Sequence, residues 1–373
     1  MLADLAMAAQ TLTVKELNRA TLARQMLLQR GAVGVVDGVE RLAGMQAQEP
    51  KHPYIGLWTR IEGFEAGDLR AALLAREVVR ATLMRSTLHL MSAAQYSALR
   101  MSMQPSMSVA LRALGARSQG LDLGRVLPAA RALLAGRPLA FDEIRARLQE
   151  QFPDVNDRAL GYAVRTLVAL VMVPAEQERW GFPRVAEFAL AEDWLGTPPA
   201  DADPQALVRC YLGAFGPASA ADAQAWSGVG GMKKVLDAMR SELVVFADSR
   251  GRELLDLPDA PRPGEKVSAP PRFLPEFDNL VLAHDDRVRI IADEHRPRVT
   301  TKNLRVRSTF LWDGFVRGTW TIETKRRVAT LRLAPFSALP RSAVKPLRTE
   351  GEALLAFAAP DAADYDVQFG EPV

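Results

Sequence analysis

The first hundred residues carry apolar positions in a helical spacing, followed by positions in an alternating spacing. Thr13 and Glu16 form a capping-box pattern that predicts the start of a first helix. The segments "VVDGVERLAGMQ" and "DLRAALLARE" predict two more helices, because their apolar residues recur every three or four positions. The segment "VVRATLMRSTLHLMS", rich in Val, Thr and Leu, predicts two strands with a turn between them. Residues 13–98 therefore read as three helices closed by a β-hairpin.

Two later segments, residues 124–195 and 204–257, repeat this order of helices and strands. In each of them a first helix leads through a Gly-bearing turn to a second helix, as in "LLAGRPLAFDEI" and "YLGAFGPASAADA". Three helices closed by a hairpin are typical of a winged helix, so we predict an α+β chain with three winged helices in tandem. Winged helices most often bind DNA, but some serve as dimerisation or scaffold modules.

The remainder of the chain changes in composition and pattern. Residues 258–271 are rich in proline and predict a linker. Residues 272–373 contain short apolar runs, including "NLVLAH" and "VRII", which predict strands of a small basic β-domain that ends in an acidic tail. Asp313 and Gly314 lie between alternating apolar residues and predict a hairpin with a type I′ turn.

Composition is that of an ordinary globular protein, with 48% hydrophobic and 24% charged residues in 373. No uninterrupted apolar run of about 18 residues occurs, and the N-terminus lacks the order of an export signal, so we expect a cytoplasmic protein without a membrane partner. A single cysteine and four scattered histidines lack metal-ligand spacing. We expect neither a metal nor a cofactor.

Charge is unevenly distributed, although the formal net charge is only +3. Between Arg296 and Glu350 the chain has thirteen Lys or Arg against three acids, a net charge of +10. This excess favours a polyanionic partner, and a solvated basic sheet balanced by acids elsewhere is the alternative. The predicted contacts to DNA in this part of the chain are Arg305, Arg307, Lys325, Arg326 and Arg327.

Two glutamines, Gln46 and Gln48, stand one residue apart where a helical pattern stops. Residues two apart point the same way only on an extended chain, and Pro50 disfavours helical geometry at the residue before it. The segment from Gln46 onwards is therefore predicted to be extended, with Ala47 turned to the core. Two solvated glutamines at a helix end fit the spacing as well. The Walker, dinucleotide, nucleophile-elbow and zinc-protease motifs are absent.

Four segments together resemble the signature blocks of the AlkZ-like DNA glycosylases: "LAGMQAQEPKHPYIGLWTRI", "VRATLMRSTLHLMSAAQYSALR", "FLPEFDNLVLAHDDRVRI" and "FLWDGFVRGTW". They occur in the family's order and span about residues 13 to 340. The resemblance implies three winged helices that form a C-shaped DNA cleft, followed by a C-terminal β-domain. It also implies that Gln46 and Gln48 are the catalytic Q-x-Q motif. A related branch has Asp at the second position, and this chain does not.

The resemblance implies a monofunctional DNA glycosylase. The chemistry of two amide side chains limits which substrates such an enzyme can act on. Glutamine cannot deprotonate water, so it can only position water and stabilise positive charge through its carbonyl dipole. That suffices for a cationic N7-alkylpurine, which leaves as a neutral base. The expected partner is double-stranded DNA that carries alkylated purines or crosslinks. We expect the protein to bind it as a monomer, and to serve in DNA repair or in self-resistance to a toxin. No lysine in the motif can form a Schiff base, so no strand cleavage is expected. A non-catalytic DNA-binding regulator is the alternative.

Five further residues near the motif are candidates for the site. His89 lies in the predicted hairpin, where it either serves the site or is satisfied within the hairpin. Lys51 and His52 follow the glutamines and either contact phosphate or belong to a solvated loop. Arg80 and Arg85 flank the hairpin and are predicted to contact the DNA backbone.

Overall fold

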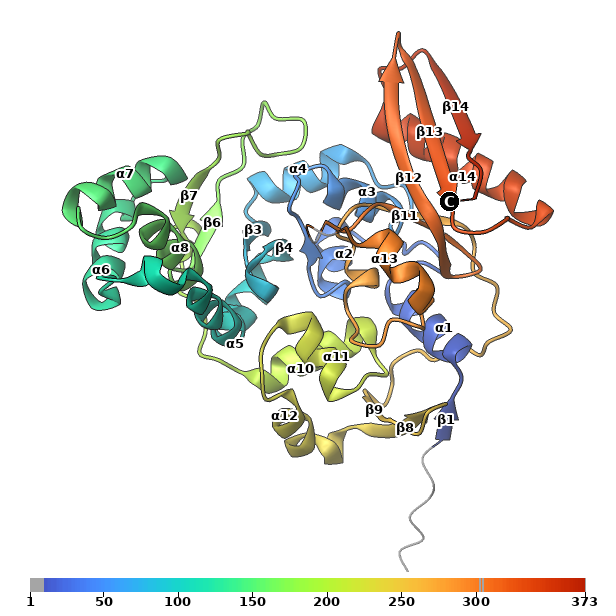
Figure 1. The fold of residues 1–373 in the computed structure, drawn as a ribbon, viewed down its shortest axis with the longest axis horizontal. Helices are drawn as coiled ribbons and strands as arrows, with labels where there is room; N and C mark the ends of the chain where they lie inside the picture. The colour runs from blue at the N-terminus through green and yellow to red at the C-terminus, as the bar shows by residue number, and fades with distance from the viewer. Residues whose placement is uncertain (1–9, 302, 304, 373) are drawn as a thin grey trace, which may run out of the picture. The chain divides into compact units, whose positions relative to one another are not determined.

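A computed structural model describes residues 10–301, 303 and 305–372, and the described chain forms two compact units. Unit 1 is drawn from Met1–Arg30, Val208–Ala225 and Gly231–Val373, and unit 2 from Gly31–Leu207 and Trp226–Gly230. Figure 1 shows the ribbon, in which helices and strands occur along the whole chain. The predicted α+β class is confirmed. Among the described residues, no helix is long and apolar enough to cross a bilayer.

The first half of unit 2 has three helices and a three-stranded sheet of order β2-β4-β3. Both pairings in this sheet are antiparallel. The elements follow one another as α2 (Val35–Arg41), β2 (Met45–Gln46), α3 (His52–Trp58), α4 (Ala66–Leu74), β3 (Val78–Thr82) and β4 (Leu88–Ser92). A short 3-10 turn, Met84–Ser86, joins β3 to β4, where the sequence predicts a turn.

Helix α2 ends earlier than its apolar pattern predicts, and this places Gln46 in a strand and Gln48 in the bend that follows it. Its last residue is Arg41, and the chain then reverses through Ala43 and Gly44, both with positive φ. A Cβ on Gly44 would lie 2.9 Å from the carbonyl oxygen of Leu90, so glycine is required there. Strand β2 begins directly after this turn. The left-handed turn therefore sets the point at which Gln46 enters the sheet.

The second half of unit 2 repeats the order helix, strand, helix, helix, strand, strand. A long helix, α5 (Ala93–Ala110), and a 3-10 segment, Leu111–Ser118, lead into it. The repeat consists of α6 (Leu123–Leu134), β5 (Leu139–Ala140), α7 (Phe141–Gln151), α8 (Asp157–Leu167), β6 (Leu170–Met172) and β7 (Glu187–Leu190), followed by α9 (Ala191–Leu195). Its sheet has the order β5-β7-β6, which matches that of the first half.

A third helical segment lies mainly in unit 1 and ends in a hairpin. It contains α10 (Pro204–Phe215), α11 (Ala220–Ser227), α12 (Met232–Ala238), β8 (Val244–Asp248) and β9 (Glu253–Asp256). An isolated bridge joins Ala218 to Leu255 of β9, and β1 (Gln10–Leu12) pairs in parallel with β8. The first strand of this segment is thus reduced to a single bridge, and the N-terminal strand extends the sheet on its other side.

Helix α1 (Val14–Arg24) groups with unit 1, whereas the sequence places it with residues 13–98. Its predicted N-cap is confirmed, because Thr13 and Glu16 form a capping box. The amide nitrogen of Asn18 donates to the carbonyl oxygens of Arg289, at 2.7 Å, and Gly314, at 2.8 Å. These partners lie in the C-terminal half of the chain. An apolar spacing predicts a helix but cannot name the surface against which it packs.

A five-stranded sheet dominates the C-terminal part of unit 1. Its order is β10-β11-β12-β13-β14, antiparallel except for the last pair. The elements are β10 (Arg272–Leu274), α13 (Arg296–Val299), β11 (Thr309–Trp312), β12 (Phe315–Lys325), β13 (Val328–Pro335), α14 (Arg341–Ala358) and β14 (Asp364–Phe369). Helix α14, in red beside this sheet in Figure 1, packs against it, and a Cβ on Gly351 would lie 2.8 Å from the side chain of Leu331.

One prediction for this region, the hairpin turn, is confirmed, and two predicted strands are wrong. Asp313 and Gly314 both have positive φ between paired Trp312 and Phe315, as a type I′ turn requires. The acidic tail of the chain is also part of the sheet, as strand β14. However, "NLVLAH" forms a 3-10 turn, Asn279–Val281, because the carboxylate of Asp278 accepts from the backbone nitrogen of Leu280. The "VRII" segment is buried without being a strand.

Candidate active site

Gln46 lies inside a sheet and is buried. Strand β2 pairs with β4 so that Gln46 is opposite His89, and only 8% of Gln46 is exposed. The extended geometry and the fully buried Ala47 confirm that the helical pattern stops before the motif. The alternative of two solvated glutamines at a helix end is wrong for Gln46. A buried amide needs hydrogen-bond partners, and the hairpin provides one.

The partner is Arg85, in the turn between β3 and β4. Its Nη2 donates to Oε1 of Gln46 at 3.0 Å and lies 3.5 Å from Nε2 of His89. Its Nη1 donates to the carbonyl oxygen of Trp226, a fully buried residue of unit 2. The half-buried guanidinium therefore faces the motif, and the expectation that it serves as a backbone contact has no support in this geometry.

His89 is completely buried and uncharged. Burial, and secondarily the cation of Arg85, lowers the pKa of His89 to about 3. Its Nδ1 lies 3.0 Å from the carbonyl oxygen of Thr87, which can only accept, so Nδ1 carries the proton and Nε2 is a bare acceptor. His89 is thus satisfied within the hairpin and also lies in the immediate neighbourhood of Gln46. The interpretation that His89 is satisfied within the hairpin is confirmed, and its role in the site stays a prediction.

Gln48 is exposed in a bend after β2, and Arg80 fixes the backbone of that bend. Nε of Arg80 donates to the carbonyl oxygen of Ala47 at 2.9 Å, and its Nη2 donates to that of Gln48 at 3.1 Å. Arg80 is only 4% exposed and lies 5.0 Å from the ring centre of Phe182. Burial lowers the pKa of Arg80 to about 10, which leaves it cationic near neutral pH. Two donors of Arg80 thus hold the backbone of the motif, and a contact of Arg80 with the DNA backbone stays a prediction.

The two residues after the bend have different environments. Lys51 is exposed at the start of α3, where it is accessible to a phosphate. His52 is only 4% exposed within α3, so the prediction of a phosphate contact or a solvated loop is wrong for this residue. His52 is the first residue of α3, and its burial depends on the surrounding fold, which the local sequence does not reveal.

The predicted basic contacts of unit 1 are on the surface. Arg305 pairs with Glu276 at 2.8 Å, and Arg307 is exposed. Lys325, Arg326 and Arg327 are exposed at the tip of the β12–β13 hairpin, where Lys325 pairs with Val328 across the turn. Arg326 and Arg327 have φ of +50° and +65°, a conformation that L residues adopt at a cost.

Sequence analysis missed two residues that support the site, Trp226 and Phe182. Trp226 accepts the hydrogen bond from Arg85, and Phe182 packs against Arg80. Each is far along the chain from the residue it supports. No local pattern marks them, since a buried aromatic at helical or loop spacing predicts only packing.

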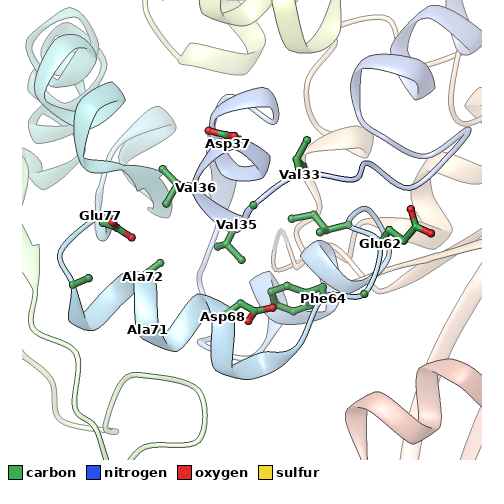
Figure 2. Close-up of a pocket in the computed structure, with 14 residues that line it drawn as sticks. Val33, Val35, Val36, Asp37, Glu62, Phe64, Asp68, Ala71, Ala72 and Glu77 are labelled. Atoms are coloured by element: carbon green, nitrogen blue, oxygen red, sulfur yellow. The ribbon is translucent and has the colours of Figure 1, made fainter.

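A separate hollow of about 520 Å³ lies in unit 2, between the start of α2 and helix α4 (Figure 2). Its apolar wall includes Val35 and Phe64. Its polar lining consists of carboxylates, namely Asp37, Glu62, Asp68 and Glu77. Because carboxylates repel phosphate, this hollow is unsuited to hold a DNA strand. Within the part of the chain that the structure describes, no cluster of side chains could hold a metal ion.

The family described as "DNA glycosylase AlkZ-like" matches residues 39–357, which is most of the chain. The chain belongs to the AlkZ-like DNA glycosylase family. It is therefore a DNA glycosylase, and the alternative of a non-catalytic regulator is set aside. The matched region contains Gln46, Gln48, Arg85 and His89.

Two comparisons with individual proteins agree with this assignment. The chain is 25% identical over 352 residues to an interstrand DNA cross-link repair glycosylase of Streptomyces sahachiroi, covering 88% of this chain and 91% of that protein. The solved structure of Streptomyces sahachiroi DNA glycosylase AlkZ is similar in fold, with a TM-score of 0.80 and 21% identity. That similarity covers 97% of this chain and 100% of the other. The AlkZ-like fold thus extends over nearly the whole chain.

Proposed function

We propose that this AlkZ-like glycosylase hydrolyses the N-glycosidic bond of cationic N7-alkylated purines and unhooks DNA interstrand crosslinks. The observation that carries the proposal is the chemistry around Gln46. An amide, a guanidinium and a neutral imidazole lie together there, and Gln48 follows in the exposed bend. The relative from Streptomyces sahachiroi is named for the repair of interstrand crosslinks, which supports the substrate class.

These groups suit a leaving group that is already activated. Neither an amide nor an imidazole of pKa about 3 can remove a proton from water as breaking of the bond begins. An N7-alkylguanine carries a positive charge, so the electron pair of the C1′–N9 bond neutralises it as the base departs. Water then adds to C1′ and releases its proton to solvent. Gln46 and Gln48 position the reactants, and neutral purines or uracil, which leave far less readily, are poor substrates.

DNA binding is proposed to use winged helices and the basic hairpin. Three segments, which end in β4, β7 and β9, share one order of helices and strands, and this order supports a winged-helix assignment for each. Lys325, Arg326 and Arg327 at the exposed tip of the β12–β13 hairpin are proposed to contact phosphates, together with Arg307. Arg305, paired with Glu276, is a weaker candidate because the ion pair would have to be exchanged.

The proposal is tested with defined duplexes and mass spectrometry of the released base. Substrates are a single N7-methylguanine, a nitrogen-mustard crosslink and, as controls, uracil and undamaged guanine. Release of alkylated guanine with an intact abasic strand is expected. Release of uracil, or binding without release of any base, would contradict the proposed substrate class. Strand cleavage before alkaline treatment would contradict the monofunctional chemistry.

A further inference from the structure

The side chain of Arg85 is fixed from two sides within unit 2. Arg85 and Ser86 have φ of +55° and +58°, and such residues cost about 1–3 kcal/mol each unless their surroundings hold them. Gly228 has a φ of +73°, and a Cβ there would clash with Oγ of Ser106 and lie 3.3 Å from both the Cα and the nitrogen of Arg85, so glycine favours this close approach. The carbonyl oxygen of Trp226 accepts from Nη1 of Arg85. The other face of the guanidinium is thereby aimed at Gln46.

This contact fixes which end of the Gln46 amide faces inwards. A guanidinium only donates hydrogen bonds, so the atom 3.0 Å from Nη2 of Arg85 must be the carbonyl oxygen, Oε1. An amide nitrogen in its place would set donor against donor. Among the described residues, the Gln46 nitrogen Nε2 has no hydrogen-bond partner. The donor end of the amide is therefore the end left for a ligand.

We propose that Arg85 is a positioning residue that holds the Gln46 amide in this orientation, so that Gln46 donates to the substrate while Gln48 accepts from water. The proposal rests on the function proposed above. The carbonyl oxygen of Gln46 accepts from Arg85, and this neighbouring positive charge weakens what the oxygen offers to water or to the developing positive sugar. Its N–H groups instead suit an acceptor atom on the departing purine, which gains electron density as the C1′–N9 bond breaks. Gln48 supplies the carbonyl that orients the attacking water.

The role of Arg85 is tested by a double-mutant cycle with Gln46. Arg85→Met keeps an apolar stem and removes the donors, and we expect single-turnover excision of N7-methylguanine to fall about 10- to 100-fold. In the Gln46→Ala background the same change should cost little more, because Arg85 acts through Gln46. Arg85→Lys should recover part of the rate, since one donor still reaches Oε1. Multiplicative losses in the cycle would refute the positioning role.

Undamaged duplex provides the readout that separates positioning from a phosphate contact. With Arg85→Met, the Kd for undamaged DNA and its salt dependence should stay as in the wild type. Weaker binding, with a salt slope smaller by about one, would assign Arg85 to a phosphate instead. A wild-type protein that releases no N7-methylguanine would refute the proposed function. An active wild type with an equally active Arg85→Met would refute only the role of Arg85.

The donor assignment has its own test in the two glutamate variants. Gln46→Glu keeps the size of the side chain and its bond to Arg85 but removes the N–H groups. It should lose most excision while its melting temperature is maintained. Gln48→Glu removes only donors from a residue that we assign as an acceptor, so it should keep a much larger share of the wild-type rate. Equal losses in the two variants, or wild-type excision by Gln46→Glu, would overturn the assignment.

Discussion

Replacing each glutamine of the motif by alanine should separate stability from catalysis. Gln48 is exposed, and its replacement should change the free energy of unfolding by less than about 0.5 kcal/mol. Gln46 is 8% exposed and bonded to a cation, so Gln46→Ala removes a hydrogen bond to a charged group that is worth about 1.5–3 kcal/mol. For a unit of this size that is a decrease in Tm of about 3–12 °C. Differential scanning calorimetry measures both values.

The rate of excision should fall by similar amounts in Gln46→Ala and Gln48→Ala. The first variant loses the N–H donors of Gln46, and the second loses the carbonyl acceptor of Gln48. Loss of one positioned dipole costs about 10²–10³-fold in a preorganised site. A labile cationic substrate needs less assistance, so each single variant is expected at the lower end of that range and the double variant clearly lower. Single-turnover release of N7-methylguanine, measured below the melting transition of each variant, gives these rates. Gln48→Asp should keep substantial activity, because a carboxylate also accepts hydrogen bonds from water.

The control is Glu49→Gln, which changes an exposed residue and removes the carboxylate that follows Gln48 in the sequence. It should excise at the wild-type rate. If Glu49→Gln abolishes release while the alanine variants do not, a carboxylate base performs the reaction and the amide mechanism is wrong. Full excision by the double variant Gln46→Ala, Gln48→Ala would refute the mechanism as well.

Other predictions concern the surface and the buried charges. Reversing Arg326 and Arg327 to Glu should weaken binding to every DNA sequence alike and lower the salt slope by about two; an unchanged slope contradicts this contact. Burial lowers the pKa of His89 from 6.5 to about 3, so the unfolded chain binds a proton at this residue more readily than the folded protein. The contribution of His89 to the free energy of unfolding is therefore complete above pH 6.5 and is lost as the pH falls towards about 3. His89→Asn should reduce the slope of unfolding free energy near pH 5 by about 1.4 kcal/mol per pH unit, measured by urea denaturation. Asp256→Ala leaves the buried guanidinium of Arg24 unpaired, so unfolding free energy should fall by about 3–5 kcal/mol, and a loss below 1 would contradict this.

Periodicity predicted most elements of the fold because those elements are defined by local spacing. The capping box at Thr13 and the Asp313–Gly314 turn are set by a few adjacent residues, and both were predicted correctly. The grouping of α1 with unit 1 could not be predicted, since it depends on contacts with Gly314 and Arg289 at the other end of the chain.

The same distinction applies to the site. Proline at position 50 predicted a helix end close to the motif, but α2 already ends at Arg41, where the chain turns through Ala43 and Gly44. The burial of Gln46 was not predictable, because it depends on pairing with β4 across the hairpin. Arg80 was assigned to DNA for its charge alone, yet it bonds to the carbonyl oxygens of Ala47 and Gln48. The charge of a residue indicates which groups its side chain can bind. Only the fold decides whether those groups belong to DNA or to the protein itself.

The attachment of helix α1 to the C-terminal sheet has a consequence for the order in which the chain folds during synthesis. Asn18 bonds to Gly314, 296 residues further along. At about 5–20 residues per second, a ribosome needs about 15–59 s to produce that partner after the helix has emerged. Over this interval Leu22 and Leu27 lack the cluster in which they are finally buried, while most of unit 2 is already complete. Until this cluster forms, Leu22 and Leu27 are uncovered apolar side chains to which a chaperone can bind.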